Sequence, residues 1–244
     1  MRKVIFHYHL FKNAGTSVDE VLKANFPNGW ATAEFSGPHA ANLDQIKQWL
    51  QQENETVAFS SHTAMLPPPI IDGVEIFPVL FIRHPIVRIA SAYAFESKQG
   101  VNTFGSTVAR NTSLAGYIQI HLSLSHISQC RNFQTARLAQ FFNGAEGDIS
   151  VLALQALDAL PFVGLVEEFD QSIQRLANWL SPHFPDFKPI AARKNVTSNL
   201  SFSLEQKLEQ IRAQIGDDCY DQVINANLAD IVLFEAVRKK YSSQ

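Results

Sequence analysis

Residues 6–22 read FHYHLFKNAGTSVDEVL, with a lysine, a glycine and two hydroxyl residues between an apolar run and a helical pattern. Residues 3–10 overlap the start of this stretch and alternate between apolar and polar positions. They are rich in β-branched and aromatic side chains, a pattern that predicts a strand. Val18, Val21 and Leu22 then recur at the spacing of an apolar helical face. The stretch therefore predicts a strand, a short turn and a helix, and the polar residues of the turn are the first candidates for a functional site.

The rest of the chain continues this alternation of strands and helices. Apolar segments predict buried strands at 56–62, 77–85 and 162–169. Amphipathic segments predict helices at 42–53, from Pro85 onward, and at 132–142, 169–180, 203–215 and 218–241, whereas 99–128 is interpreted as a loop followed by a helix. This order predicts an α/β fold, in which a single domain over residues 1–244 holds a mainly parallel β-sheet flanked by helices.

Composition restricts the location and the partners of the protein. The formal net charge is −3, so no overall basic field favours nucleic acid or a membrane surface. No apolar run approaches the roughly 20 residues of a membrane span. Cys130 and Cys219 lie far apart without metal-binding spacing, which is typical of free thiols in a reducing compartment. We therefore expect a cytoplasmic protein without a membrane span, a nucleic-acid partner or a metal; the oligomeric state stays open.

The turn after the first strand has the components of an anion-binding site. In an open parallel sheet, ligands bind at the carboxyl ends of the strands, and the amides at a helix N-terminus attract phosphate-like groups. Gly15 permits a close approach of the backbone, Thr16 and Ser17 offer hydroxyl groups, and Lys12 adds a positive charge. The same residues also fit an ordinary helix start. The phosphate loop of nucleoside triphosphatases, G-x-x-x-x-G-K-[ST], is absent.

A second candidate anion site follows the strand at 77–85. Arg83 stands at the end of that strand, and Ser91 lies two turns into the next helix. A guanidinium group and a hydroxyl group in this order predict a clamp for an anion. The alternative is an arginine that extends to solvent or pairs with an acid, and it is weakened because Arg83-His84-Pro85 offers no acid locally.

Together these two segments resemble the sulfotransferases that use 3′-phosphoadenosine 5′-phosphosulfate (PAPS). K-x-x-G-T-S follows the first strand and R-x-P-x-x-R-x-x-S a later one, in the order of that family. The first segment is similar to the H-x-P-K-T-G-G-T-S form of the carbohydrate branch, which includes heparan sulfate 2-O- and 6-O-sulfotransferases. The matching residues are His9, Lys12, Gly15, Thr16 and Ser17. Phe11 replaces the proline of that form, and Ala14 replaces its first glycine. Residues 132–139 and 162–176 look like later, less specific blocks of the family.

The resemblance implies a P-loop-like nucleotide-binding fold of the sulfotransferase type and an enzyme that transfers a sulfuryl group from PAPS to a hydroxyl acceptor. It assigns the 5′-phosphosulfate to the first segment, which comprises Lys12, Asn13, Ala14, Gly15, Thr16 and Ser17. It assigns the 3′-phosphate to Arg83 and Ser91, and a late basic loop with Arg193 and Lys194 to closure over the nucleotide. The carbohydrate-type first segment favours a saccharide, a glycoconjugate or another small molecule as the acceptor, with no metal ion.

Sulfuryl transfer requires a positive group near the leaving oxygen and a base for the acceptor hydroxyl. Lys12 is the candidate for the first role. His62, just past a predicted strand, is the candidate base, and it is similar in order and context to the catalytic histidine of the 2-O-sulfotransferase branch. His39 and Glu34 are alternative bases, and His9 is expected mainly in the core.

Two other functions remain open from the sequence. An atypical ATP-dependent small-molecule kinase would need an acidic metal ligand, for which Glu167 or Asp170 is available, but the Gly-Lys-Ser/Thr signature is missing. A non-catalytic module that binds 3′-phosphoadenosine 5′-phosphate (PAP) would bind nucleotide without turnover. Such a module would not require both Lys12 and His62.

Overall fold

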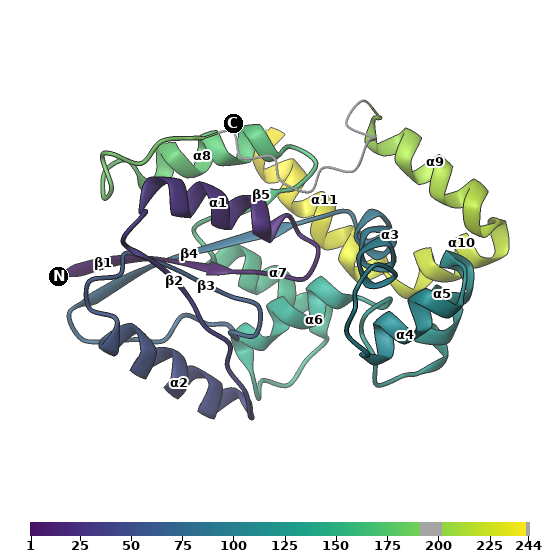
Figure 1. The fold of residues 1–244 in the computed structure, drawn as a ribbon, viewed down its shortest axis with the longest axis horizontal. Coiled ribbons are helices and arrows are strands. Elements are labelled where there is room, and N and C mark those ends of the chain that lie inside the picture. Colours follow the sequence, from purple (N-terminus) through teal and green to yellow (C-terminus); the bar gives the residue numbers. More distant parts are fainter. Residues whose placement is uncertain (191–201, 243–244) are drawn as a thin grey trace. The chain divides into compact units, whose positions relative to one another are not determined.

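The computed structural model of the chain describes residues 1–190 and 202–242 (Figure 1). The chain divides into two compact units. In the described residues, the first unit comprises 1–82 and 137–190, and the second comprises 83–136 and 202–242. No helix in these described residues is long and apolar enough to cross a membrane.

The first unit contains a five-stranded sheet in which all neighbouring strands are parallel. Its strands are β1 (Arg2–Tyr8), β2 (Trp30–Thr32), β3 (Ala58–Ser61), β4 (Val74–Ile82) and β5 (Val163–Leu165), in the order β2-β3-β1-β4-β5. Tyr8 of β1 lies opposite both Ser61 of β3 and Leu80 of β4. The carboxyl ends of β2, β3 and β1 are therefore neighbours, and the prediction of an α/β fold with a mainly parallel sheet is confirmed.

Helices cover both faces of this sheet (Figure 1). The helices α1 (Gly15–Asn25) and α8 (Phe169–Leu180) share one apolar cluster with Ile5 of β1. On the other face, Trp49 of α2 (His39–Gln52) packs against Phe6 at a ring-centroid distance of 6.2 Å. Because side chains alternate along a strand, His7 and His9 point to the same face as Ile5, toward α1.

The segment directly before β5 also forms helices. They are α6 (Phe133–Ala139), a 3₁₀ turn (Gln140–Phe142) and α7 (Ile149–Ala159). The Asp148 side chain begins α7 by accepting a hydrogen bond from the Ser150 amide at 2.7 Å. Neither α7 nor the three-residue strand β2 is predicted from the sequence.

The described residues of the second unit are mainly helical. Its helices are α3 (Pro85–Glu96), α4 (Phe104–Asn111), α5 (Leu114–Ser123), α9 (Leu204–Ile215), α10 (Asp217–Ala226) and α11 (Leu228–Ser242). Pro85 occupies the first turn of α3, as the sequence predicts. Buried side chains from α3, α5, α9 and α10 form one apolar cluster in this unit.

Two predictions in this unit differ from the structure in detail. In 99–128 a loop is followed by two helices, α4 and α5, rather than by one, and the N-cap Thr103 of α4 forms a capping box with Ser106. The single helix expected over 218–241 is divided at Asn227. The side-chain Nδ2 of Asn227 donates to the Cys130 carbonyl at 2.8 Å, so a contact between distant parts of the sequence fixes the break.

Candidate functional site

The turn between β1 and α1 has an uncommon backbone conformation. Lys12 and Ala14 have φ angles of 64° and 59°, in the left-handed region that residues other than glycine rarely adopt. Between them, the side-chain Nδ2 of Asn13 donates to the Phe81 carbonyl of β4 at 2.7 Å, and Asn13 is 1% exposed. Asn13 therefore anchors the turn to the sheet. Left-handed residues in such a turn are typical of the backbone nests that bind anions.

Helix α1 begins directly after this turn. Its N-cap residue is Ala14, and no side chain in the described residues caps the helix through that position. The first amides of a helix have no partner within the helix and carry partial positive charge. Thr16 is exposed and Ser17 is buried in this first turn. Residues 11–17, called the anion loop below, thus combine the positive end of the helix dipole with the charge of Lys12.

A histidine ring lies directly beside Gly15, so a side chain at position 15 would displace it. A Cβ atom at Gly15 would lie 1.9 Å from Cδ2 and 2.0 Å from Nε2 of His9. Real Cβ atoms do not approach other atoms so closely. The sequence suggests that Gly15 makes room for a ligand, whereas the structure shows that it makes room for the imidazole of His9.

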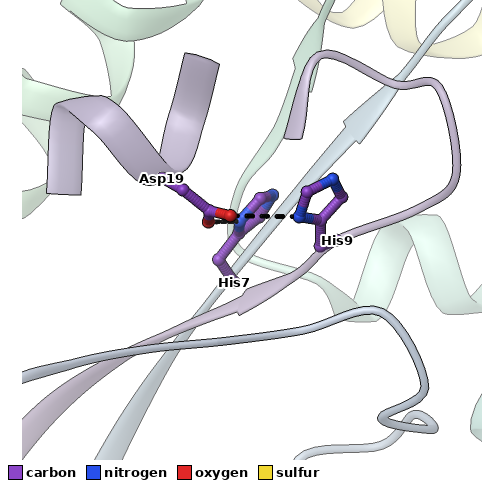
Figure 2. A group of neighbouring side chains, drawn as sticks. All are labelled: His7, His9 and Asp19. Atoms are coloured by element: carbon purple, nitrogen blue, oxygen red, sulfur yellow. Dashed lines mark hydrogen bonds and ion pairs between the residues drawn. The ribbon is translucent and has the colours of Figure 1, made fainter. Parts of the chain in front are cut away.

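His7 and His9 share a single carboxylate, that of Asp19 on α1 (Figure 2). His7 Nδ1 lies 2.8 Å from one carboxylate oxygen, and His9 Nδ1 lies 3.1 Å from the other. Burial alone would raise the pKa of Asp19, but hydrogen bonds from His7, His9 and Ser60 lower it far below its usual range. An ionised carboxylate only accepts hydrogen bonds, so both histidines donate from Nδ1.

Both imidazoles are enclosed by the protein. His7 is 1% exposed and His9 is 8% exposed. Burial lowers the pKa of His9, and the hydrogen bond to Asp19 offsets this only in part. His9 is therefore a neutral ring at pH 7, with its proton on Nδ1.

The same three side chains form the single group in the described part of the chain whose donor atoms could hold a metal ion, all lying within 4.8 Å of one another. Histidine nitrogens and a carboxylate are ligands that zinc accepts. The contacts in the structure, however, have the lengths of hydrogen bonds, and the Ser60 hydroxyl also lies 3.1 Å from His7 Nδ1. A hydrogen-bonded triad accounts for this geometry without a metal ion.

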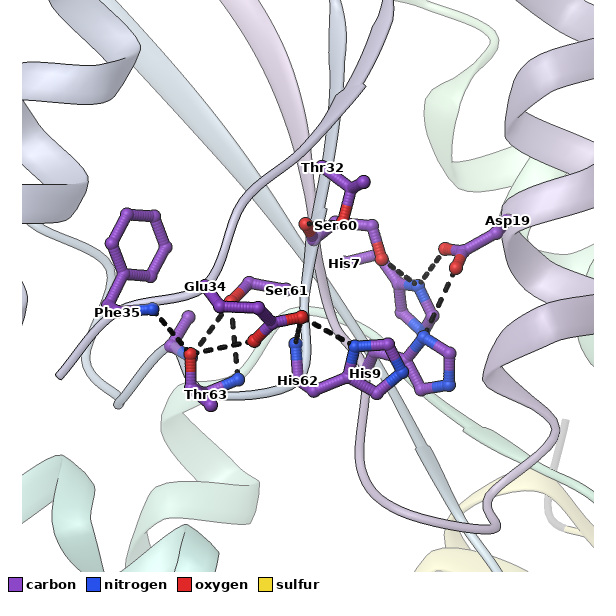
Figure 3. A network of polar contacts seen from close by, with 11 residues as sticks. His7, His9, Asp19, Thr32, Glu34, Phe35, Ser60, Ser61, His62 and Thr63 are labelled. Carbon is purple, nitrogen blue, oxygen red and sulfur yellow. Dashed lines mark hydrogen bonds and ion pairs between the residues drawn. The ribbon is translucent and has the colours of Figure 1, made fainter. Parts of the chain in front are cut away.

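His62 and Glu34 form a second pair, at the carboxyl ends of β3 and β2 (Figure 3). His62 Nδ1 lies 2.7 Å from Glu34 Oε1, and the two side chains are 50% and 49% exposed. Burial alone would raise the pKa of Glu34, but hydrogen bonds from Thr63 and His62 lower it. Because the carboxylate is ionised, His62 donates from Nδ1, and its Nε2 is left as a proton acceptor.

Hydroxyl groups fix the orientation of this pair. Ser61 Oγ accepts hydrogen bonds from the amides of Thr63 and Ala64 at 3.2 and 3.1 Å and so shapes the turn after β3. The Thr63 hydroxyl donates to Glu34 Oε2 at 2.7 Å and accepts from the Phe35 amide at 2.6 Å. Glu34 is thus held at both oxygens (Figure 3).

A single ring connects the exposed pair to the anion loop. The imidazoles of His9 and His62 lie with their centroids 3.8 Å apart and their planes at 31°. His9 also lies against Gly15. The predicted base and the predicted anion-binding turn therefore meet in the first unit, with His9 between them.

Other predicted site residues are placed differently. Arg83 and Ser91 belong to the second unit, and the Gln134 side chain bonds both the amide and the carbonyl of Arg83 at 2.8 Å. Arg193 and Lys194 lie outside the described residues. His39 Nε2 lies 2.6 Å from the Leu66 carbonyl, to which it donates, so His39 is a weaker candidate base than His62.

The sequence does not predict the role of Asp19 or the pairing of Glu34 with His62. One signal is nevertheless present, because the spacing of His7 and His9 places both rings on one face of a strand, beside the helix that carries Asp19. The pairing of Glu34 with His62 depends on β2 lying next to β3, which no local pattern reveals.

Comparison with known proteins gives a relative but no activity. No model of a known protein family matches the chain. A protein of Archaeoglobus fulgidus, described as an uncharacterized protein, is 40% identical over 249 residues, and the match covers 98% of each chain. The chain belongs to the same family as this archaeal protein. The function must therefore be inferred from the site.

Proposed function

We propose that the protein is a PAPS-dependent sulfotransferase that transfers a sulfuryl group to a hydroxyl group of a saccharide, a glycoconjugate or another small molecule. The observation that carries this proposal is the contact of the His9 ring with both His62 and Gly15, which brings a base and an anion loop together. The sequence resemblance of residues 9–17 to the carbohydrate sulfotransferases supports the same function.

The anion loop fits the phosphosulfate end of PAPS. Its left-handed residues, the uncapped start of α1 and the charge of Lys12 all favour an anionic group. When bound, PAPS supplies the sulfuryl group and a phosphate leaving group. Lys12 and the first amides of α1 would stabilise negative charge on the leaving oxygen, which is the largest electrostatic requirement of such a transfer.

The exposed pair of His62 and Glu34 supplies the base. His62 Nε2 accepts the proton of the acceptor hydroxyl, and Glu34 stabilises the resulting imidazolium through Nδ1. A positioned base of this kind contributes roughly 10²- to 10⁴-fold to a rate. The exposure of both side chains leaves them accessible to an acceptor.

The remaining assignments of the proposal follow the resemblance. Arg83 and Ser91 would bind the 3′-phosphate of the nucleotide, and Arg193 and Lys194 would close over it. We propose that the protein acts in the cytoplasm and that the reaction needs no metal ion. The kinase alternative would use Glu167 or Asp170 as a metal ligand, and the geometry of the site adds no support for that role.

Calorimetric titration tests the cofactor first. We expect PAP to bind with a dissociation constant of about 1 μM, a free energy of about −8 kcal/mol, and ATP with magnesium not to bind. Binding of ATP with magnesium and not of PAP would overturn the proposal in favour of a kinase.

Turnover tests the base. With PAPS and a panel of hydroxyl acceptors, His62→Gln and Glu34→Gln should lose activity while their affinity for PAP stays unchanged. The matched control is His126→Gln, which changes an exposed histidine of the second unit and should remain active. PAP binding without turnover of any acceptor would support a non-catalytic PAP-binding module. Full activity of His62→Gln would contradict the assignment of the base.

A further inference from the structure

We propose that Asp19, acting through His9, positions the imidazole of His62, so that the buried triad of His7, Asp19 and His9 is a working part of the site. The role of this positioning in catalysis rests on the proposed function. The contacts among His7, Asp19, His9 and His62 are independent of that function, because the structure of the first unit contains each of them.

Three contacts hold the ring of His9. Its Nδ1 donates to the Asp19 carboxylate at 3.1 Å. One part of the ring lies against Gly15, where any side chain would collide with it. The ring of His7 lies nearly parallel to it, with centroids 5.2 Å apart and an interplanar angle of 23°. His9 is therefore a fixed surface rather than a mobile side chain.

His62, in contrast, has an exposed side chain with one side-chain hydrogen bond among those that the structure describes, to Glu34. A single hydrogen bond at Nδ1 fixes one atom of a ring but leaves the ring free to tilt about that contact. The ring of His9, 3.8 Å away from centroid to centroid, restricts this tilt. Together Glu34 and His9 set the direction of His62 Nε2, the atom that is proposed to accept the proton.

The charges around His9 also suit a role beside a base. The groups that face it are His7 on the same strand, Asp19 on α1, and His62 and Glu34 at the ends of β3 and β2. A protonated His9 would repel the imidazolium that His62 becomes, whereas a neutral His9 does not. The buried negative charge of Asp19 favours that imidazolium. A purely structural core would not need this arrangement, since burying a carboxylate costs free energy that apolar residues of similar volume avoid.

The substitution Asp19→Asn tests the inference with little change in volume. Asparagine keeps one acceptor oxygen and replaces the other with an NH₂ donor, so one of the two imidazoles must lose its Nδ1–H bond. Histidine ¹⁵N NMR without substrate should show Nδ1–H tautomers of His9 and His62 in the wild-type protein and altered His62 signals in the variant. The matched control is Glu20→Gln, at the next residue of α1. Glu20 pairs with Lys23 at 3.3 Å, so this change should leave the NMR signals of His62 unchanged.

Kinetics separate positioning from general stability. In Asp19→Asn, kcat should fall by about 10- to 100-fold, as expected for a misplaced catalytic group, while the KM for the acceptor and the affinity for PAP stay within about twofold. In a His62→Ala background, Asp19→Asn should cause no further loss of turnover.

Each outcome decides the inference. Unchanged His62 signals and unchanged kcat in a folded Asp19→Asn variant would overturn it. If that variant does not fold, the wild-type spectra decide, since an Nε2–H tautomer of His9 would contradict the bond to Asp19. Zinc bound by the wild-type protein and lost in Asp19→Asn would make the triad a metal site instead. Altered His62 signals in a protein that does not bind PAP would retain the positioning of His62 and overturn the sulfotransferase proposal alone.

Discussion

Single residues at the carboxyl end of β1 restrict one another through direct contact. Because a Cβ at position 15 would lie 1.9 Å from the His9 ring, Gly15→Ala must displace that ring. Overpacking of this kind costs about 1–3 kcal/mol, so we expect the free energy of unfolding in urea to fall by that amount. His62 should also lose its neighbour, with a corresponding loss of turnover.

The double variant His9→Ala/Gly15→Ala distinguishes collision from other effects of the new methyl group. With the ring removed, the added methyl group should cost much less than in the wild-type background, so the two substitutions should not be additive. Equal costs of Gly15→Ala in both backgrounds would show that the His9 ring is not the reason for the glycine.

At the scale of elements, the turn after β1 depends on β4. Asn13→Ala removes the side chain that donates a buried hydrogen bond of 2.7 Å to the Phe81 carbonyl. Leaving a buried polar group without its partner costs about 1–3 kcal/mol, and we expect thermal and urea unfolding to show this loss. If the turn binds the phosphosulfate, the affinity for PAP should fall as well. Unchanged stability would show that the turn does not depend on this anchor.

The strands and helices also show which elements a sequence can reveal. Apolar runs at 3–10, 56–62, 77–85 and 162–169 predict β1, β3, β4 and β5, because burial on both faces requires such runs. The strand β2 is only three residues long and carries too little pattern to be recognised. The break at Asn227 depends on a bond to Cys130, almost a hundred residues away, which local periodicity cannot contain.

The residues of the candidate site likewise divide into those that a local sequence pattern indicates and those that only the three-dimensional fold brings together. Lys12 and His62 could be chosen as candidates because each lies beside a strand-to-helix or strand-to-turn segment with a recognisable order, whereas the contact of Gly15 with the His9 ring could not be foreseen. The pair of Glu34 and His62 and the triad around Asp19 could not, because they require the strand order β2-β3-β1 and the packing of α1 on β1. The single domain over residues 1–244 stays a prediction.

For the whole molecule, buried histidines make stability depend on pH. Burial lowers the pKa of His84 to about 4 and also lowers that of His9. An unfolded histidine binds its proton near pH 6.5, so between about pH 4 and 6.5 the unfolded chain holds more protons than the folded one, and stability rises with pH. The free energy of unfolding should therefore fall on acidification over this range, with about 3 kcal/mol as the upper limit for His84.

Thermal unfolding between pH 4 and 7 measures this effect. His84→Gln should flatten the dependence of the melting temperature on pH, whereas His126→Gln, which changes an exposed histidine, should not. A wild-type protein whose melting temperature is constant across this range would contradict the prediction.

The proposed binding of the nucleotide 3′-phosphate by Arg83 can be tested in the whole protein. Arg83→Ala should weaken PAP binding by more than about 1.5 kcal/mol, the low end for a hydrogen bond to a charged group. Adenosine 5′-monophosphate lacks the 3′-phosphate, so its affinity should not change in calorimetric titration. Arg110→Ala removes a cation bonded to backbone carbonyls on the exposed surface and serves as the control. Equal losses for both nucleotides would contradict the 3′-phosphate assignment.

A side chain at position 15 and the ring of His9 cannot occupy the same space, and this conflict also limits how the sequences of related proteins can diverge. A lineage that first gains a side chain at position 15 meets the ring, and one that first loses the ring leaves Asp19 with one fewer hydrogen-bond donor. Neither single step is neutral, but loss of the ring removes the steric reason for a glycine at position 15. Across the family, positions 9 and 15 are therefore expected to vary as a pair, with histidine and glycine retained together or replaced together.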